Sequence, residues 1–104
     1  MKHFLIDIHY AASPEVIQRI KPAHRAFLSS GYEQKLLLMS GPKEPATGGL
    51  VVARAGSLEE IQSFFMQDPY AIEKAATHAF YEFSPVLYQP FIQDWVTQGE
   101  NNPL

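Results

Sequence analysis

The chain begins with an alternating stretch, Lys2-His3-Phe4-Leu5-Ile6-Asp7-Ile8-His9-Tyr10, in which every second side chain from Phe4 onward is apolar or aromatic. This period of two predicts a β-strand. One face would carry Phe4, Ile6, Ile8 and Tyr10, and the other face is mixed. Such a strand buries one face against a core, so the sequence that follows must supply the elements that cover it.

A helix is predicted directly after this strand. Ser13-Pro14-Glu15 provides an N-cap, a proline at the first helical position and an acidic first turn, and the helix should end near Gly31. The positions that form its apolar stripe are Ile17, Ile20, Phe27 and Leu28. His24 falls on the same stripe and is expected to point inward. Pro22 predicts a kink near residues 18–22, and a helix that restarted there would place His24 in its first turn.

The remaining pattern completes a ferredoxin-like order. Residues 35–40 and 50–55 are short apolar runs joined by a turn-rich loop, which predicts two strands. A capping box at residues 57–60 opens a second helix that Pro69 should stop at about Gln67. Residues 70–76 predict a further helical turn or two, and residues 79–83 a last strand. The order predicts an α+β fold, βαββαβ, with two helices on one face of a four-stranded antiparallel sheet.

Length and composition restrict the class of protein. The 104 residues predict one domain, with a core at about residues 1–88 and a C-terminal extension at 89–104. The eight Lys and Arg residues are scattered and the net charge is −3, which argues against a nucleic-acid partner. No apolar run approaches the ~20 residues that cross a bilayer, so we expect no membrane partner and a cytoplasmic location. The absence of cysteine excludes thiolate chemistry.

Two polar residues stand out, His24 on the helix stripe and Asp68 before Pro69. A histidine and a carboxylate suffice for proton transfer near neutral pH, because the carboxylate orients the imidazole and stabilises its charged form. Both also have structural interpretations: His24 as a core histidine bonded to backbone or water, and Asp68 as a helix N-cap. Lys21 and Arg25 flank His24 and would attract an anion, or would form a solvated helix face.

Ser40-Gly41-Pro42 ends a predicted strand and would line a cavity mouth or simply form a turn. His3, His9 and His78 lack the spacing of a helical metal site, so we predict no metal.

The residues that carry these hypotheses resemble the YCII (YciI-like) family. The resemblance rests on Lys21-Pro22-Ala23-His24, Ser40-Gly41-Pro42, Gly48-Gly49 and Asp68-Pro69-Tyr70, and it runs from about residue 1 to 85. It implies a fold related to the dimeric α/β barrels, a catalytic pair at His24 and Asp68, and a contribution from Tyr70 to substrate binding. One branch of the family dehydrochlorinates a chlorinated muconate-type acid, and muconolactone isomerases share the wider fold. This chain departs from the pattern at Lys21, where arginine is usual, and in its C-terminal extension.

A homodimer is expected, because the sheet face opposite the helices needs a cover. Tyr88, Phe91 and Trp95 add more aromatic surface than a small monomer readily buries. In the competing interpretation, the C-terminal segment folds back over its own sheet as a lid.

The functional hypothesis is a cofactor-free elimination or isomerisation of a small organic acid, with His24 and Asp68 as the proton-transfer pair. Lys21, Arg25, Ser40, Gly41, Pro42 and Tyr70 would bind the substrate. The alternative is a non-catalytic binding or accessory module in which the pair is structural. Cofactor-independent oxygenation is a third hypothesis that rests on fold analogy alone.

Overall fold

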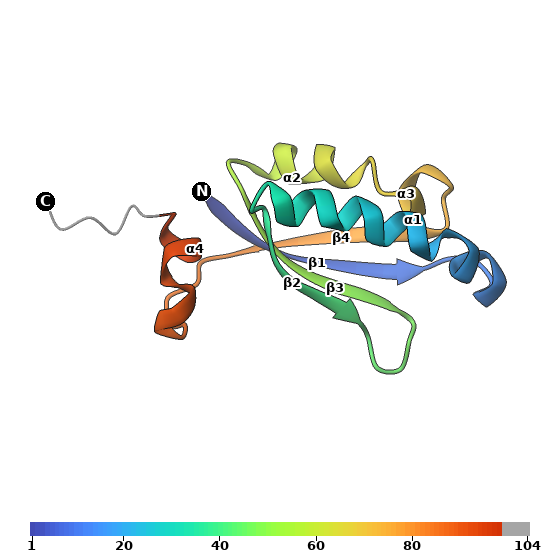
Figure 1. Cartoon of the computed structure of the whole chain (residues 1–104), viewed down its shortest axis with the longest axis horizontal. Coiled ribbons are helices and arrows are strands. Elements are labelled where there is room, and N and C mark those ends of the chain that lie inside the picture. The colour runs from blue at the N-terminus through green and yellow to red at the C-terminus, as the bar shows by residue number, and fades with distance from the viewer. Residues whose placement is uncertain (99–104) are drawn as a thin grey trace, which may run out of the picture.

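The computed structural model describes residues 1–98, in which one antiparallel sheet carries helices on one face (Figure 1). The strands are β1 (Lys2–Tyr10), β2 (Leu37–Pro42), β3 (Gly48–Ala55) and β4 (Ala76–Phe83), and their order in the sheet is β2-β3-β1-β4. Helices α1 (Pro14–Glu33) and α2 (Leu58–Phe65) cover the same face, with the short α3 (Pro69–Ile72) beside them. The predicted α+β ferredoxin-like fold is confirmed. None of the helices in this part of the chain is long and apolar enough to cross a bilayer.

The core lies between the sheet and the helices. The alternation in β1 is as predicted, with Phe4, Ile6 and Ile8 at most 1% exposed. They meet the inward side chains of β3, of α1 and of α2, which include Val51, Ala53, Ile17, Ile20, Ile61 and Phe65. The central strand β1 pairs with β3 on one side and β4 on the other, so the register of β1 sets which residues of both neighbours face the helices.

Helix α1 is longer and more continuous than the sequence indicated. The Ser13 hydroxyl caps it by accepting the Val16 N–H, and it runs through Pro22 to Glu33, two residues beyond Gly31. It therefore does not restart at Pro22, and His24 lies far from the helix N-terminus. The positive end of the helix dipole therefore does not act on His24. The prediction that His24 points inward is confirmed, because its side chain is buried.

Several strand limits differ from the sequence-based prediction. Residues 35 and 36 belong to the turn after α1, where Lys35 has a φ of 61°, and β2 continues through Gly41 and Pro42 instead of ending at Ser40. The helical prediction for residues 70–76 is too long, since α3 ends at Ile72 and β4 begins at Ala76. Pairing with a neighbouring strand extends both beyond what their own residues indicate, because Pro42 of β2 pairs with Gly49 of β3 and Ala76 of β4 pairs with Tyr10 of β1.

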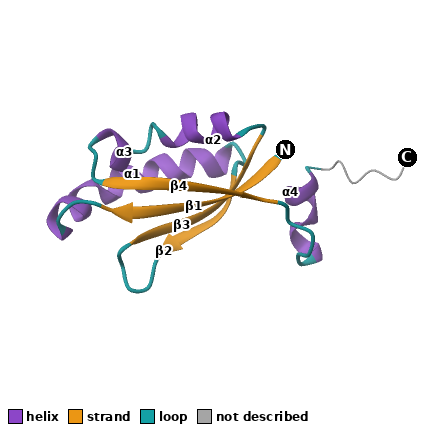
Figure 2. Cartoon of the chain, turned by 180° about the vertical axis from the view of Figure 1, so that it is seen from behind, coloured by secondary structure: helices purple, strands orange, loops and turns teal. Residues whose placement is uncertain are grey.

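The C-terminal segment lies beyond one end of the sheet. The 3₁₀ helix η1 (Pro90–Ile92) and helix α4 (Gln93–Thr97) leave most of the open sheet face uncovered in both views (Figures 1 and 2), so they do not form the alternative lid over it. Trp95 contacts this face at its end, where it packs against His3 and Arg54. Arg54 anchors the segment, donating from Nη1 to the Trp95 carbonyl at 2.6 Å and from Nε to the Lys35 carbonyl at 2.8 Å. The final part of the predicted extension, residues 99–104, lies outside the described residues.

The sheet face opposite the helices is open and carries both apolar and polar side chains, the polar ones including Asp7, His9 and Arg54. Its large exposed side chains are Met39, Leu50, Tyr81 and Phe83, and Tyr81 is 55% exposed. Figure 2 shows no helix on this face of the sheet.

Candidate active site

A hydrogen-bond network centred on Asp68 joins three elements of the fold. His24 from α1 places Nδ1 at 2.8 Å from Asp68 Oδ1, and His78 from β4 places Nε2 at 2.9 Å from Oδ2. The backbone N–H of Tyr70 donates to Oδ1 at 3.0 Å, which is the N-cap bond of α3. Asp68 is fully buried. The two interpretations of Asp68 are therefore compatible, because one carboxylate both caps a helix and holds an imidazole 44 positions away.

The charge of Asp68 fixes the proton positions on both histidines. Burial raises the pKa of this carboxyl group, but the hydrogen bonds from His24 and His78 outweigh it, so the pKa is lowered overall. Asp68 is then a carboxylate at neutral pH, and a carboxylate can only accept hydrogen bonds. His24 must donate from Nδ1–H and His78 from Nε2–H. In its neutral form His24 carries its free lone pair on Nε2.

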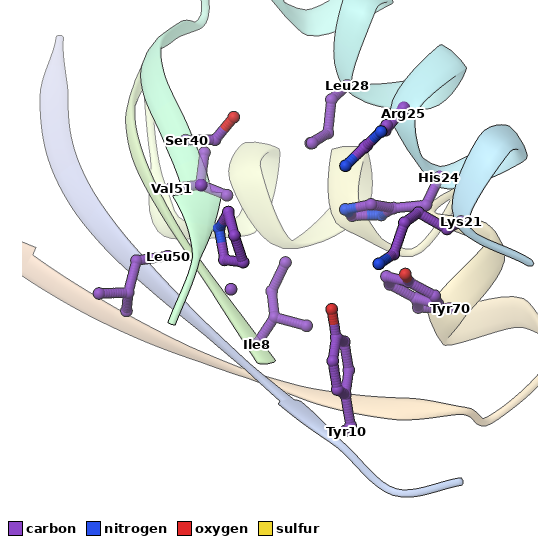
Figure 3. A pocket seen from close by; sticks show the side chains of 13 residues that line it. Ile8, Tyr10, Lys21, His24, Arg25, Leu28, Ser40, Leu50, Val51 and Tyr70 are labelled. Carbon is purple, nitrogen blue, oxygen red and sulfur yellow. The ribbon is translucent and has the colours of Figure 1, made fainter. Parts of the chain in front are cut away.

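His24 forms part of the wall of a cavity of about 220 Å³ between α1, α3 and the sheet. The lining residues are Ile8, Tyr10, Lys21, His24, Arg25, Leu28, Ser40, Gly41, Pro42, Gly49, Leu50, Val51 and Tyr70. Figure 3 shows the ring of His24, the amine of Lys21 and the hydroxyl ends of Tyr10 and Tyr70 directed into the same hollow. All six residues that the sequence assigned to substrate binding line this cavity. Asp68 lies behind His24 and does not line it.

Tyr70 brings an unused hydrogen-bond donor to the cavity. Its ring stacks on the imidazole of His24, with ring centroids 4.2 Å apart, and the residue is only 1% exposed. Its hydroxyl is buried and has no hydrogen-bond partner among the described residues. Burial, followed by the neighbouring Tyr10, raises the pKa of Tyr70, so the hydroxyl keeps its proton at neutral pH. A ligand oxygen would satisfy this donor.

The charged side chains at the cavity favour an anion. Lys21 is half-buried and Arg25 is exposed, and neither forms an ion pair within residues 1–98. Within the same residues no cluster of three or more His, Cys, Asp or Glu side chains could hold a metal ion. Arginine and lysine side chains without ion-pair partners can hydrogen-bond a carboxylate or an oxyanion.

Sequence reasoning missed His78 and Tyr10. The signal for His78 is its alternation with Ala76 and Phe80 on the helix-facing side of β4, which the prediction of helix for residues 70–76 obscured. Tyr10 was assigned to the buried face of β1, and it lies at the cavity end of that face.

The fold and the cavity define a small α+β protein in which a buried histidine–carboxylate pair borders a pocket of about 220 Å³. The chain belongs to the YCII family: the model of the YCII-related domain matches residues 1–84.

Among solved structures, the chain is similar to 5-chloro-2-hydroxyhydroquinone dehydrochlorinase (TftG) from Burkholderia phenoliruptrix AC1100, in complex with 2,5-dihydroxybenzoquinone. The TM-score is 0.64 with 21% sequence identity, over 84% of this chain and 93% of that chain, which is a likeness of fold. A search of curated proteins gives no match.

Proposed function

We propose that this YCII protein is a cofactor-free enzyme that moves a proton on a small organic acid, in an elimination of the lyase (dehydrochlorinase) type or an isomerisation. The observation that carries the proposal is the 2.8 Å bond between His24 Nδ1 and the buried Asp68, with His24 on the cavity wall. That bond leaves the Nε2 lone pair of His24 as the base facing the substrate. It also places a negative charge where it stabilises the imidazolium that forms.

The reaction begins at a carbon made acidic by a neighbouring carbonyl group. His24 Nε2 takes the proton from this carbon, and the electron pair of the broken C–H bond moves toward the carbonyl oxygen as an enolate. In an elimination, the enolate returns the pair to form a new C=C bond and expels a leaving group such as chloride. In an isomerisation, the imidazolium of His24 returns the proton at another carbon. Either route needs no oxidant and no external electron carrier.

The other cavity residues would bind the substrate. Lys21 and Arg25 hold its anionic group, and the Tyr70 hydroxyl donates to the oxygen on which charge develops. Ser40, Gly41 and Pro42 form the opposite wall on strand β2 and limit the size of the substrate. A cavity of about 220 Å³ suits a compact acid or a single ring.

The name of the structural neighbour supports the choice of substrate class. TftG is a dehydrochlorinase, and its structure holds 2,5-dihydroxybenzoquinone. A compact molecule of this kind, with several oxygens around one ring, matches the donors and cations of the cavity in this chain. We therefore choose 2,5-dihydroxybenzoquinone as the first binding probe.

We also propose that the protein is a cytoplasmic homodimer built from a single domain, with a core at about residues 1–88 and an extension at 89–104. The large exposed side chains on the open sheet face, which include Tyr81 and Phe83, support pairing with a second copy, because exposed apolar groups of this size are costly in water. Light scattering should give twice the chain mass of 11.7 kDa. A monomeric mass at micromolar concentration would contradict the dimer.

Solvent deuterium exchange tests the chemistry before the natural substrate is known. The protein is incubated in D₂O with a panel of small carbonyl-bearing acids, and ¹H NMR follows loss of signal at the carbon next to the carbonyl. Exchange on at least one acid should fall by about 10²- to 10⁴-fold in His24→Gln, the usual contribution of a general base. His9→Gln is the matched control, because His9 is exposed and does not line the cavity. Tight binding of the acids with no exchange in the unaltered protein would favour the binding-module alternative.

A further inference from the structure

His78, the second histidine that is hydrogen-bonded to Asp68, has no role in the proton transfer proposed above. Its bond to Asp68 is nevertheless about as short as that of His24. The Nε2–Oδ2 distance of His78 is 2.9 Å, close to the 2.8 Å of the His24 bond. The His78 side chain is 8% exposed and does not line the cavity that His24 faces. It cannot touch a substrate there. Any effect of His78 on the reaction must pass through Asp68.

The two carboxylate oxygens of Asp68 accept different numbers of hydrogen bonds. Oδ1 receives the Tyr70 N–H and the His24 N–H, whereas Oδ2 receives the His78 N–H. If the Oδ2 bond were absent, a buried charged oxygen would lack a partner, which is costly. The carboxylate would relieve that cost by turning about its Cβ–Cγ bond or by taking up a proton. Either response disturbs the bond that orients His24.

Apart from Gln62, the residues around the outer side of His78 are apolar. Its ring lies 5.7 Å from that of Phe65, and it borders a second, shallower cavity of about 300 Å³. The other residues around that cavity are Gln62, Phe65, Met66, Ala71 and Phe80. In the described part of the chain, Asp68 is the one side chain to which His78 is hydrogen-bonded. The orientation of this imidazole is therefore set by Asp68, and in turn it holds Asp68.

We propose that His78 is a positioning residue: its Nε2–H fixes the Asp68 carboxylate so that Oδ1 keeps His24 in the Nδ1–H tautomer, with the Nε2 lone pair in the cavity. The proposal deepens the proposed function and rests on it for its catalytic meaning. Its structural part is independent of any substrate. An Asp68 that became a neutral acid would donate to His24 Nδ1 instead, and Nε2 would then carry the proton and cease to be a base.

Three variants separate the donated bond from the space that the ring fills. In His78→Gln the side-chain amide nitrogen reaches the place of Nε2 and still donates, whereas the amide of His78→Asn is too short and His78→Leu has no donor. Long-range ¹H–¹⁵N NMR reports the tautomer of His24, and ¹³C NMR reports the ionisation of the Asp68 carboxyl. We expect His24 to keep its Nδ1–H tautomer in His78→Gln. In His78→Asn and His78→Leu we expect an Nε2–H signal from His24 and an upward shift of the Asp68 pKa.

The polar Asn variant keeps the test valid if Leu fails to fold. The proposal is overturned if the His24 tautomer and the Asp68 titration stay as in the unaltered protein in both His78→Asn and His78→Leu. If His78→Leu does not fold, the same result in His78→Asn alone overturns it. In the deuterium-exchange assay His78→Asn and His78→Leu should lower kcat with little change in KM, and His78→Gln should keep kcat close to that of the unaltered protein. Failure of all exchange in the unaltered protein would refute the proposed function while leaving the NMR result on His78 intact.

Discussion

Replacement of Asp68 distinguishes a helix cap from the centre of a buried charge network. Loss of an N-cap alone costs about 1 kcal/mol. Removal of a charged partner from a buried pair costs about 3–5 kcal/mol, because the remaining polar groups lose their acceptor. Asp68 accepts bonds from two imidazoles and one backbone N–H and is fully buried, so we expect Asp68→Ala to lower the free energy of unfolding by about 3–5 kcal/mol.

Asp68→Asn is the matched comparison. The amide oxygen of Asn can still accept the Tyr70 N–H, so its cost should be about 1–2 kcal/mol. Urea unfolding measures both values. With a slope of about 1.5 kcal/mol per M, a loss of 4 kcal/mol lowers the midpoint by about 2–3 M. Equal costs of about 1 kcal/mol for Ala and Asn would refute the network and leave Asp68 as a cap only.

Three further predictions follow from particular contacts. The pKa of Asp68 is lowered in the folded state, so its contribution to stability is complete above about pH 4, the usual pKa of an aspartate, and is lost as the pH falls below that value. The free energy of unfolding should therefore fall more steeply below about pH 4 in the unaltered protein than in Asp68→Asn. Gly48→Ala should unfold or severely destabilise the protein, since a Cβ there would overlap the backbone carbonyl oxygen of Ile8 in β1. Gly41→Ala meets nothing within 4 Å and should leave the thermal midpoint nearly unchanged. Arg54→Lys should loosen helix α4, because an amine cannot replace the two bonds of the guanidinium, and limited proteolysis near Trp95 should then be faster at unchanged global stability.

The sequence was sufficient where local periodicity determines the structure. The alternation in residues 2–10 and the apolar stripe around His24 gave the strand, the helix and the inward direction of the imidazole. The Asp-Pro pair gave the start of α3. These features depend on neighbours within a few positions along the chain.

The sequence was insufficient where pairing between distant strands decides the outcome. The alternation of His78 with Ala76 and Phe80 indicates only that the three side chains share a face. That face lies toward the helices because Ile8 stands opposite His78 in the β1–β4 register, and local sequence does not specify this pairing. Helix α1 continues through Pro22 although proline removes a backbone donor. Buried contacts of the residues on either side, Ile20 and His24, compensate for that loss.

The Asp68 carboxylate also affects how the protein opens and closes. It ties the first helix, the start of α3 and the edge strand β4 together at one buried point. Edge strands and short helices usually exchange their amide protons through local fraying, at a small fraction of the global unfolding free energy. Here β4 cannot separate near His78 without exposing a charge that two other elements share. We therefore expect the amides around His78 and Tyr70 to exchange only with global unfolding, which would keep water away from the back of the site throughout the folded lifetime of the protein.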